Sequence, residues 1–204
     1  MEAADSTKKR TQGERTAITR RQILDAAVEL LYSEGYAATT TLRIQQVAGV
    51  SRGRLLHQFP SRDVLLVAAV QHLVTARIAD LSRHDDWPQN SSERIDRAVD
   101  VMWHTYQQPY FWAATELWLA ARSNQGLRNA LLPHERNIGI LVRDVADSFF
   151  GDELCARANY PMLRELLNAA MRGTALTYAL EPRDYSTDPH LPEWKSTARV
   201  LLGG

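Results

Sequence analysis

Four arginines stand in a stretch of the sequence that contains no acidic residue. The 28 residues from 35 to 62 hold Arg43, Arg52, Arg54 and Arg62 but no Asp or Glu. An arginine guanidinium offers paired donors that fit phosphate oxygens and the N7 and O6 acceptors of guanine. In a neutral chain, such a stretch is the electrostatic footprint expected where phosphates approach. A solvated helix face is the alternative explanation, and charge alone does not decide between the two.

The charge of the chain is divided unevenly, although its total is zero. Residues 1–62 contain ten Lys or Arg against six acids, a net charge of +4, whereas residues 63–204 hold fourteen against eighteen, a net charge of −4. The first part therefore supplies the field that would attract a polyanion. With 204 residues, of which 45% are hydrophobic, the chain can form one or two domains with a buried core.

Several classes of protein are excluded by composition and motifs. The single cysteine, Cys155, excludes disulfide scaffolds and thiolate metal sites within one chain. No apolar run approaches the ~20 residues of a membrane-spanning helix, and the first residues lack the apolar stretch of a secretory signal. The pair His134-Glu135 has no second histidine at zinc-protease spacing, and no phosphate loop or nucleophile elbow is found. We expect a cytoplasmic protein that contacts no membrane, is not an enzyme and needs no metal or cofactor.

Two short helices joined by a tight turn must position the arginines. A longer helix is predicted before them, from Thr19 to a stop at Gly35, after about sixteen disordered residues. The first short helix follows a threonine cluster and ends at Gly49, which permits the positive φ of a turn. Ser51 caps the second short helix, which reaches about Gln58 and exposes basic residues. This pattern predicts a helix-turn-helix.

The rest of the chain shows helical spacing of apolar residues and no persistent β-alternation. Gly151 is predicted to end the longest helix. The sequence therefore predicts an all-α fold of about nine helices. After the motif, the predicted helices span 63–81, 93–107, 109–123, 127–150, 161–180 and 193–202.

At this point the sequence resembles a known family. Residues 19–40 read TRRQILDAAVELLYSEGYAATT, and residues 48–66 read AGVSRGRLLHQFPSRDVLL. The order of helix, Gly-aromatic pair, threonine cluster, AGVS turn and FPS resembles the TetR family of one-component bacterial transcriptional regulators. The remainder is similar to the family only in its length and in being all-α. The resemblance implies a DNA-binding domain at residues 17–77, with its motif at about 40–59, and a ligand-binding and dimerisation domain at residues 78–204.

The resemblance also implies a mechanism of regulation. It suggests a homodimer that reads a palindromic double-stranded DNA operator, and a small-molecule effector that alters the separation of the two reading helices and usually releases the DNA. A repressor is the expected form, and an activator remains an alternative. An all-α small-molecule carrier or enzyme that reuses the scaffold is the rival class. The outward position expected for Arg52 and Arg54 argues against that rival.

Carried onto this sequence position by position, the resemblance assigns the DNA contacts. We expect Arg54 to read guanine, Gly53 to permit close backbone approach, and Arg52 to bind phosphate. The buried side of the same helix is expected to carry Leu55 and Phe59. The full set of expected contacts is Thr40, Thr41, Arg43, Ser51, Arg52, Gly53, Arg54, His57 and Arg62.

An aromatic cluster marks the second part of the chain. Six of the sixteen aromatic residues lie between residues 103 and 118. Aromatic walls with a few polar groups are typical of small-molecule pockets. The candidates for a ligand site are Trp103, Tyr106, Trp112, Glu116 and Trp118. Packed core is the alternative for the aromatic rings, and a solvent-exposed position is the alternative for Glu116.

Two C-terminal segments are candidates for a two-fold interface. The helix predicted at 161–180 mixes small residues, which let a partner helix approach closely, with apolar residues that drive association. The terminal helix at 193–202 is expected to join it. Packing within one chain is the alternative.

Overall fold

The protein is described here by a computed structural model that covers residues 11–81 and 86–203, with only the backbone considered at 78–81. Within these ranges it contains nine α-helices, one short 3-10 helix and no strand, which confirms the predicted all-α fold. None of the described helices is long and apolar enough to cross a membrane. The elements are α1 (Gln12–Ala38), α2 (Thr41–Ala48), α3 (Arg52–Gln58), α4 (Arg62–Leu81), α5 (Ser91–Thr105), α6 (Pro109–Ala121), α7 (Gln125–Cys155), α8 (Tyr160–Thr177), η1 (Tyr185–Thr187) and α9 (His190–Leu202).

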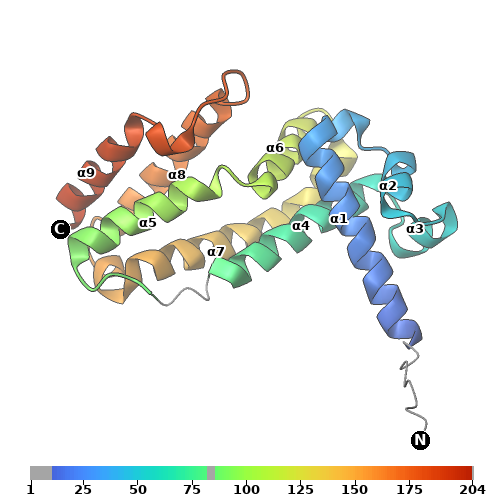
Figure 1. The fold of residues 1–204 in the computed structure, drawn as a ribbon, viewed down its shortest axis with the longest axis horizontal. Helices are drawn as coiled ribbons and strands as arrows, with labels where there is room; N and C mark the ends of the chain where they lie inside the picture. The colour runs from blue at the N-terminus through green and yellow to red at the C-terminus, as the bar shows by residue number, and fades with distance from the viewer. Residues whose placement is uncertain (1–10, 82–85, 204) are drawn as a thin grey trace, which may run out of the picture.

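The helices are arranged along one long axis. The two short helices α2 and α3 lie at one end beside α1, whereas α8 and α9 lie at the other end (Figure 1). Between these ends, α4 packs against α1 and α7, and α5 packs against α7 and α9. Residues that could approach a polyanion at α3 are therefore far from the C-terminal helices.

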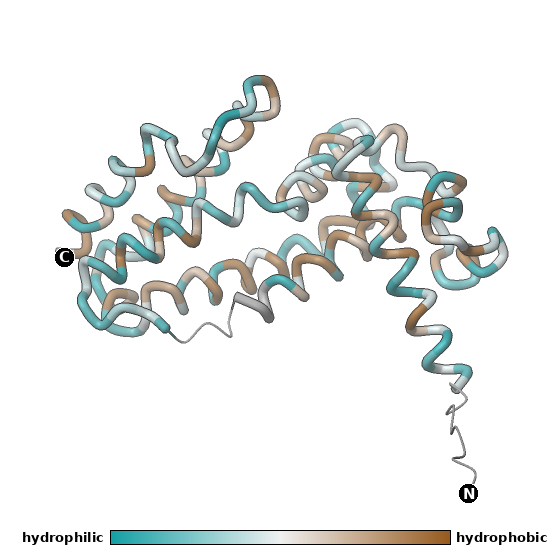
Figure 2. Tube along the Cα trace, in the orientation of Figure 1, coloured by the Kyte–Doolittle hydropathy of each residue, from teal (hydrophilic) through white to brown (hydrophobic). Residues whose placement is uncertain are grey.

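Two hydrophobic clusters hold these elements together. The first joins α1–α4 to α6 and the start of α7, and Ile23, Ile44 and Leu65 are fully buried in it. The second joins α5, the end of α7, α8 and α9 around Trp103 and Phe150. Hydrophobic residues recur along α4 and α7, whereas the first turns of α1 are mostly hydrophilic (Figure 2). Because the first cluster includes α6 and α7, the boundary placed between residues 77 and 78 stays a prediction.

The first helix begins earlier than the sequence analysis predicted. It starts at Gln12 rather than near Thr19, so the disordered arm predicted through about residue 16 is wrong from residue 12 onward. A capping box explains the difference: the Glu14 N–H donates to Thr11 Oγ1 at 3.2 Å, and the Thr11 N–H donates to Glu14 Oε2 at 2.7 Å. The part of that predicted arm at residues 1–10 lies outside the described residues.

Two glycines predicted to end helices do break the helical backbone, and a short helical segment follows each of them. Gly35 and Gly151 have φ values of 75° and 78°, and helical residues continue beyond them to Ala38 and Cys155. At the second glycine, the Arg94 guanidinium fills the space beside the backbone, and its Nε donates to the Phe149 carbonyl at 3.0 Å. A Cβ at that position would lie 2.7 Å from Arg94 Nη2.

We predict that Gly151→Ala destabilises the protein. The backbone conformation there is one that essentially only glycine adopts, at a cost of about 1–3 kcal/mol for other residues, and the Arg94 guanidinium would also have to move. Chemical denaturation should therefore show a loss of about 2 kcal/mol or more in the free energy of unfolding. Gly139→Ala is the control, because Gly139 is an ordinary helical residue of α7 with no close neighbour; it should be neutral or stabilising. Equal stability of the two variants would contradict the prediction.

Candidate nucleic-acid interface

The two short helices are positioned by side-chain caps at their first turns. Thr40 caps α2, since its Oγ1 accepts from the Arg43 N–H at 3.2 Å, and Ser51 caps α3 by accepting from the Arg54 N–H at 3.3 Å. Gly49 lies between the helices with a φ of 64°. The caps, the glycine turn and the two helix spans confirm the predicted helix-turn-helix. Thr41, the first residue of α2, is half-buried.

The outward face of α3 carries the predicted basic residues. Leu55 and Phe59 are each 1% exposed and fix the helix to the first hydrophobic cluster, as predicted. The five predicted contact residues of this segment are exposed: Ser51, Arg52, Gly53, Arg54 and His57. Leu56 is also exposed, at 44%. In the described part of the chain, the guanidinium groups of Arg52 and Arg54 form no ion pair or hydrogen bond. No atom of the residues that the structure describes lies within 4 Å of the position that a Cβ on Gly53 would take, so this face is open to close approach.

Arg43 has a partner that the sequence analysis did not predict. Its Nη2 lies 2.5 Å from Glu34 Oε1 at the end of α1, in an exposed ion pair. The hydrogen bond and the charge of Glu34 raise the pKa of the Arg43 guanidinium, which is already protonated at any ordinary pH. A phosphate that contacts Arg43 would therefore compete with this carboxylate.

Arg62 is engaged inside the molecule. Its Nε donates to the Thr39 carbonyl at 2.7 Å, its Nη2 donates to the Tyr36 carbonyl, and its guanidinium lies 4.1 Å from the centre of the Tyr36 ring. These contacts tie the start of α4 to the connection between α1 and α2. Sequence reasoning missed this role because the partners are backbone carbonyls, which no residue pattern marks.

Tyr36 also connects this region to α6 and α7. Its N–H donates to Glu116 Oε2 at 2.7 Å, and its hydroxyl donates to Asp63 Oδ1 at 3.0 Å and accepts from Asn124 Nδ2 at 3.0 Å. Burial and the nearby Asp63 carboxylate raise the pKa of the Tyr36 hydroxyl. Glu116 is thus a link between the helix-turn-helix region and the rest of the chain.

The five candidate ligand residues do not form one site. Trp103 and Tyr106 are 1% and 7% exposed and belong to the C-terminal hydrophobic cluster. Trp103 Nε1 donates to the Tyr185 carbonyl at 2.8 Å, and burial raises the pKa of Tyr106 to about 12. Trp118 packs against the other cluster, with the Arg172 guanidinium 5.2 Å from its ring centre. The remaining two, Trp112 and Glu116, line one cavity together.

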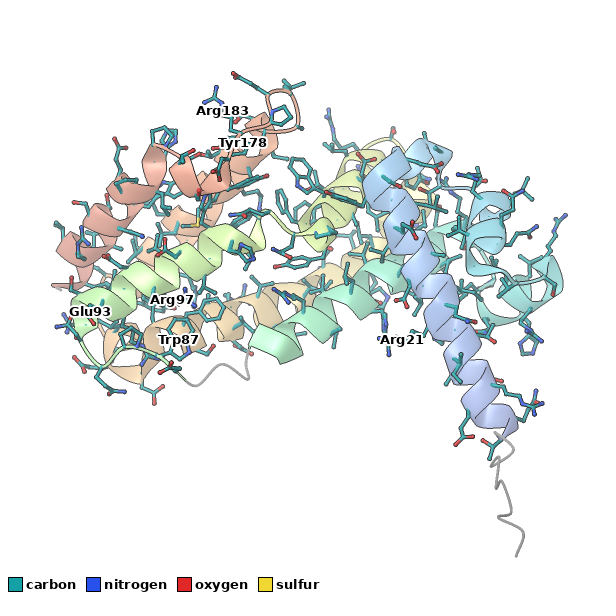
Figure 3. The ribbon with its side chains drawn as sticks, in the orientation of Figure 1. Arg21, Trp87, Glu93, Arg97, Tyr178 and Arg183 are labelled. Carbon is teal, nitrogen blue, oxygen red and sulfur yellow. The ribbon has the colours of Figure 1, made fainter. Side chains whose placement is uncertain are left out.

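Two cavities of ligand size are present among the described residues. The larger, of about 780 Å³, lies beside α5 and α9 and is lined by one predicted ligand residue, Trp103. The rest of its lining includes charged and aromatic side chains that the sequence analysis did not select, among them Trp87, Arg97, Asp100 and Lys195. The smaller, of about 360 Å³, is lined by α1, α6 and the segment after α8. In Figure 3, Trp87 and Arg97 lie between α5 and α7, whereas Tyr178 and Arg183 lie at the end of α8. No single sequence pattern marks the larger cavity, because its lining comes from α4, α5, α7, α9 and the segments that precede α5 and α9.

Comparison with known proteins places the helix-turn-helix in a family. Residues 23–69 match the family described as bacterial regulatory proteins, tetR family. The chain is 32% identical over 133 residues to the HTH-type transcriptional regulator CymR of Pseudomonas putida, a match that covers 62% of each protein. It is 35% identical over 106 residues to the HTH-type transcriptional regulator BetI of Escherichia coli, covering 51% of this chain and 53% of that protein. The matched part thus spans only half to three fifths of these curated relatives.

Solved structures share the fold over nearly the whole chain. A TetR-family transcriptional regulator from Rhodococcus sp. superposes with a TM-score of 0.66 at 19% identity, covering 91% of this chain and 99% of that one. The multidrug binding protein EbrR, solved with ethidium, superposes with a TM-score of 0.59 at 22% identity, covering 90% and 98%. At these identities the likeness concerns the fold alone. The family match at residues 23–69 places the helix-turn-helix part of the chain in the tetR family of bacterial regulatory proteins.

Proposed function

We propose that this protein is a transcriptional repressor that binds a palindromic operator as a homodimer in the cytoplasm and is released by a small-molecule effector. The observation that carries the DNA-binding part is the outward face of α3, where Arg52 and Arg54 are exposed and have no partner among the described residues. Such guanidinium groups are available for phosphates and base edges without first breaking an internal contact.

The proposed contacts fall into three groups. Arg54 reads guanine in the major groove, and Gly53 lets the α3 backbone approach the DNA. Arg52 and His57 contact phosphates. The third group contains the N-terminal turns of the two short helices, with Thr40, Thr41 and Ser51. It also contains the basic side chains of Arg43 and Arg62. Of these, Arg62 contributes mainly by holding the α1–α2 connection, because its guanidinium already binds two carbonyls.

The effector is proposed to bind in the C-terminal part of the chain, which begins after the proposed domain boundary between residues 77 and 78. The cavity of about 780 Å³ is within the usual size range of small-molecule sites, which is about 300–1,000 Å³. EbrR was solved with ethidium, and FadR of Bacillus subtilis, another fold neighbour, was solved with stearoyl-CoA. These neighbours support ligand binding by a fold of this kind, and the charged lining of the cavity here favours a polar effector.

The exposed face of α8 supports the proposed homodimer. Met162, Leu166 and Leu176 are 57%, 50% and 41% exposed although they are apolar. With Ala169 and Gly173 they recur at helical spacing along one side of the helix. Leu180, just after the helix, and Val200 of α9 are 92% and 78% exposed. Exposed apolar stripes of this kind mark protein–protein contacts. We propose that α8 and α9 pack against the same helices of a second copy around a two-fold axis.

The function is tested by titrating the purified protein into labelled DNA from upstream of its own gene, with random-sequence competitor, at two salt concentrations. We expect tight, salt-sensitive binding that resists the competitor, with two protomers per site. Weak binding that does not depend on the DNA sequence would contradict the proposed binding to a specific operator. Absence of DNA binding at low salt, after removal of any bound ligand, would favour the rival class, a small-molecule carrier that reuses the scaffold.

The roles of the two arginines on α3 are separated by Arg54→Ala and Arg52→Ala. We expect Arg54→Ala to lose about 1–3 kcal/mol of binding free energy on the operator and little on random DNA, since a base contact is lost. Arg52→Ala should weaken binding to both DNAs alike and reduce the dependence of log K on log salt by about one. Competition binding at several salt concentrations measures both effects. Identical behaviour of the two variants would show the assigned roles to be wrong.

The interface is tested by Leu166→Glu. Leu166 is half exposed in the single chain, so the folded protomer should tolerate the change, whereas two buried carboxylates would break a dimer. Sedimentation should show a dimer for the unchanged protein and a monomer for the variant, with unaltered helical content. Leu119→Glu, at an equally exposed leucine of α6, is the control and should remain dimeric. A variant that stays a dimer would place the interface elsewhere.

A further inference from the structure

The cavity of about 360 Å³ between α1, α6 and the segment after α8 has a distinct chemistry. It is called the junction cavity below, and the residues that matter in it are Tyr32, Trp112, Glu116, Tyr178, Arg183 and Tyr185. Four of these six are aromatic, and Glu116 is the single acidic side chain of its lining. Tyr32 is 54% exposed, an unusual position for a large ring on a helix whose other face is buried.

The charges around the junction cavity leave its carboxylate uncompensated. Among the described residues, Glu116 forms no ion pair, and its one hydrogen bond is accepted from the Tyr36 N–H. The one basic residue of the lining, Arg183, is paired with Glu181. A half-buried carboxylate beside aromatic rings attracts a cation both by its charge and through the electron-rich faces of those rings.

We propose that the junction cavity binds a small organic cation, held by the Glu116 carboxylate and the rings of Tyr32, Trp112 and Tyr185. Its volume is at the lower end of small-molecule sites, which favours a compact cation with one apolar or aromatic group. An anion is disfavoured by Glu116, and a neutral compound gains only the apolar contacts. This site is separate from the larger cavity proposed for the effector.

Occupation of the junction cavity is linked to the DNA-binding region through the same carboxylate. Glu116 Oε2 accepts from the Tyr36 N–H at 2.7 Å, and Gly35 permits this approach, since a Cβ there would lie 3.2 Å from that oxygen. A cation that binds the Glu116 carboxylate weakens the hydrogen bond between that carboxylate and the Tyr36 N–H. Tyr36 in turn contacts Arg62 through its carbonyl and its ring, at the connection between α1 and α2. By linkage, cation binding and DNA binding then alter each other's free energy. This second step rests on the proposed function, whereas cation binding itself does not.

The cation site is tested by calorimetric titration of the full chain with benzyltrimethylammonium, and with benzoate and benzyl alcohol as anionic and neutral counterparts. We expect the cation to bind at one site per chain, at least about tenfold more tightly than the other two. Glu116→Gln keeps an oxygen that can accept from the Tyr36 N–H but removes the charge, and it should weaken cation binding about tenfold. Glu193→Gln, which removes one charge outside the cavity, is the matched control and should bind as the unchanged protein does.

Two further measurements complete the test. Tyr32→Ala removes an exposed ring and leaves the hydrophobic core intact, so it should fold and bind the cation several-fold more weakly. Equal affinity for the three probes, or unchanged cation affinity in both Glu116→Gln and Tyr32→Ala, would overturn the site.

In fluorescence anisotropy with labelled DNA, saturating cation should weaken DNA binding about threefold or more in the unchanged protein but not in Glu116→Gln. Unchanged DNA affinity with bound cation would overturn the linkage, whereas failure to bind DNA at all would count against the proposed function and leave the calorimetric result standing.

Discussion

Backbone groups released where α1 breaks at Gly35 need partners, and satisfying them organises the region around the helix-turn-helix. An unpaired N–H or carbonyl away from water costs about as much as a lost hydrogen bond. Here the Tyr36 N–H is taken by Glu116 of α6, while the Tyr36 and Thr39 carbonyls are taken by Arg62 of α4. The Gly35 carbonyl is taken by the Thr39 hydroxyl at 2.6 Å. One break in one helix therefore fixes three elements relative to one another.

The other end of the molecule uses the same arrangement. At Gly151 the helix α7 breaks, and Arg94 of α5 donates to the carbonyls of Phe149 and Ser148 at 3.0 and 3.2 Å. In both places an arginine at the start of another helix binds backbone carbonyls close to the glycine, after Gly35 in α1 and before Gly151 in α7. A charged donor to such carbonyls forms a stronger hydrogen bond than a neutral donor does. Each hydrophobic cluster is thus accompanied by hydrogen bonds from an arginine to backbone carbonyls, from Arg62 at one end of the molecule and from Arg94 at the other.

The parts of the fold that the sequence predicted are those coded by neighbouring residues. Thr40, Gly49 and Ser51 signal the helix-turn-helix through caps and a turn, which need only three or four residues of context. The short helical segments that follow Gly35 and Gly151 could not be predicted, because they contact arginines and a glutamate far away in the sequence. The division of the predicted ligand residues between two cavities could not be predicted for a related reason: Trp103 and Trp112 are close in sequence but lie on α5 and α6, on either side of the turn at residues 106–108. A stretch of sequence does not specify which faces of two helices meet.

The acid-free stretch that first suggested a polyanion partner contains arginines of two kinds. Arg43 and Arg62 have partners, a carboxylate of α1 in one case and two backbone carbonyls in the other. Arg52 and Arg54 have none among the described residues. A phosphate must displace Glu34 to use the full charge of Arg43, whereas at α3 it displaces only water and counterions. The unpaired positive charge of the stretch is therefore concentrated on one seven-residue helix, whereas Arg43 joins α2 to α1 and Arg62 joins α4 to the α1–α2 connection. Net charge counts all four arginines equally, but the hydrogen-bond partners decide which of them can act on DNA.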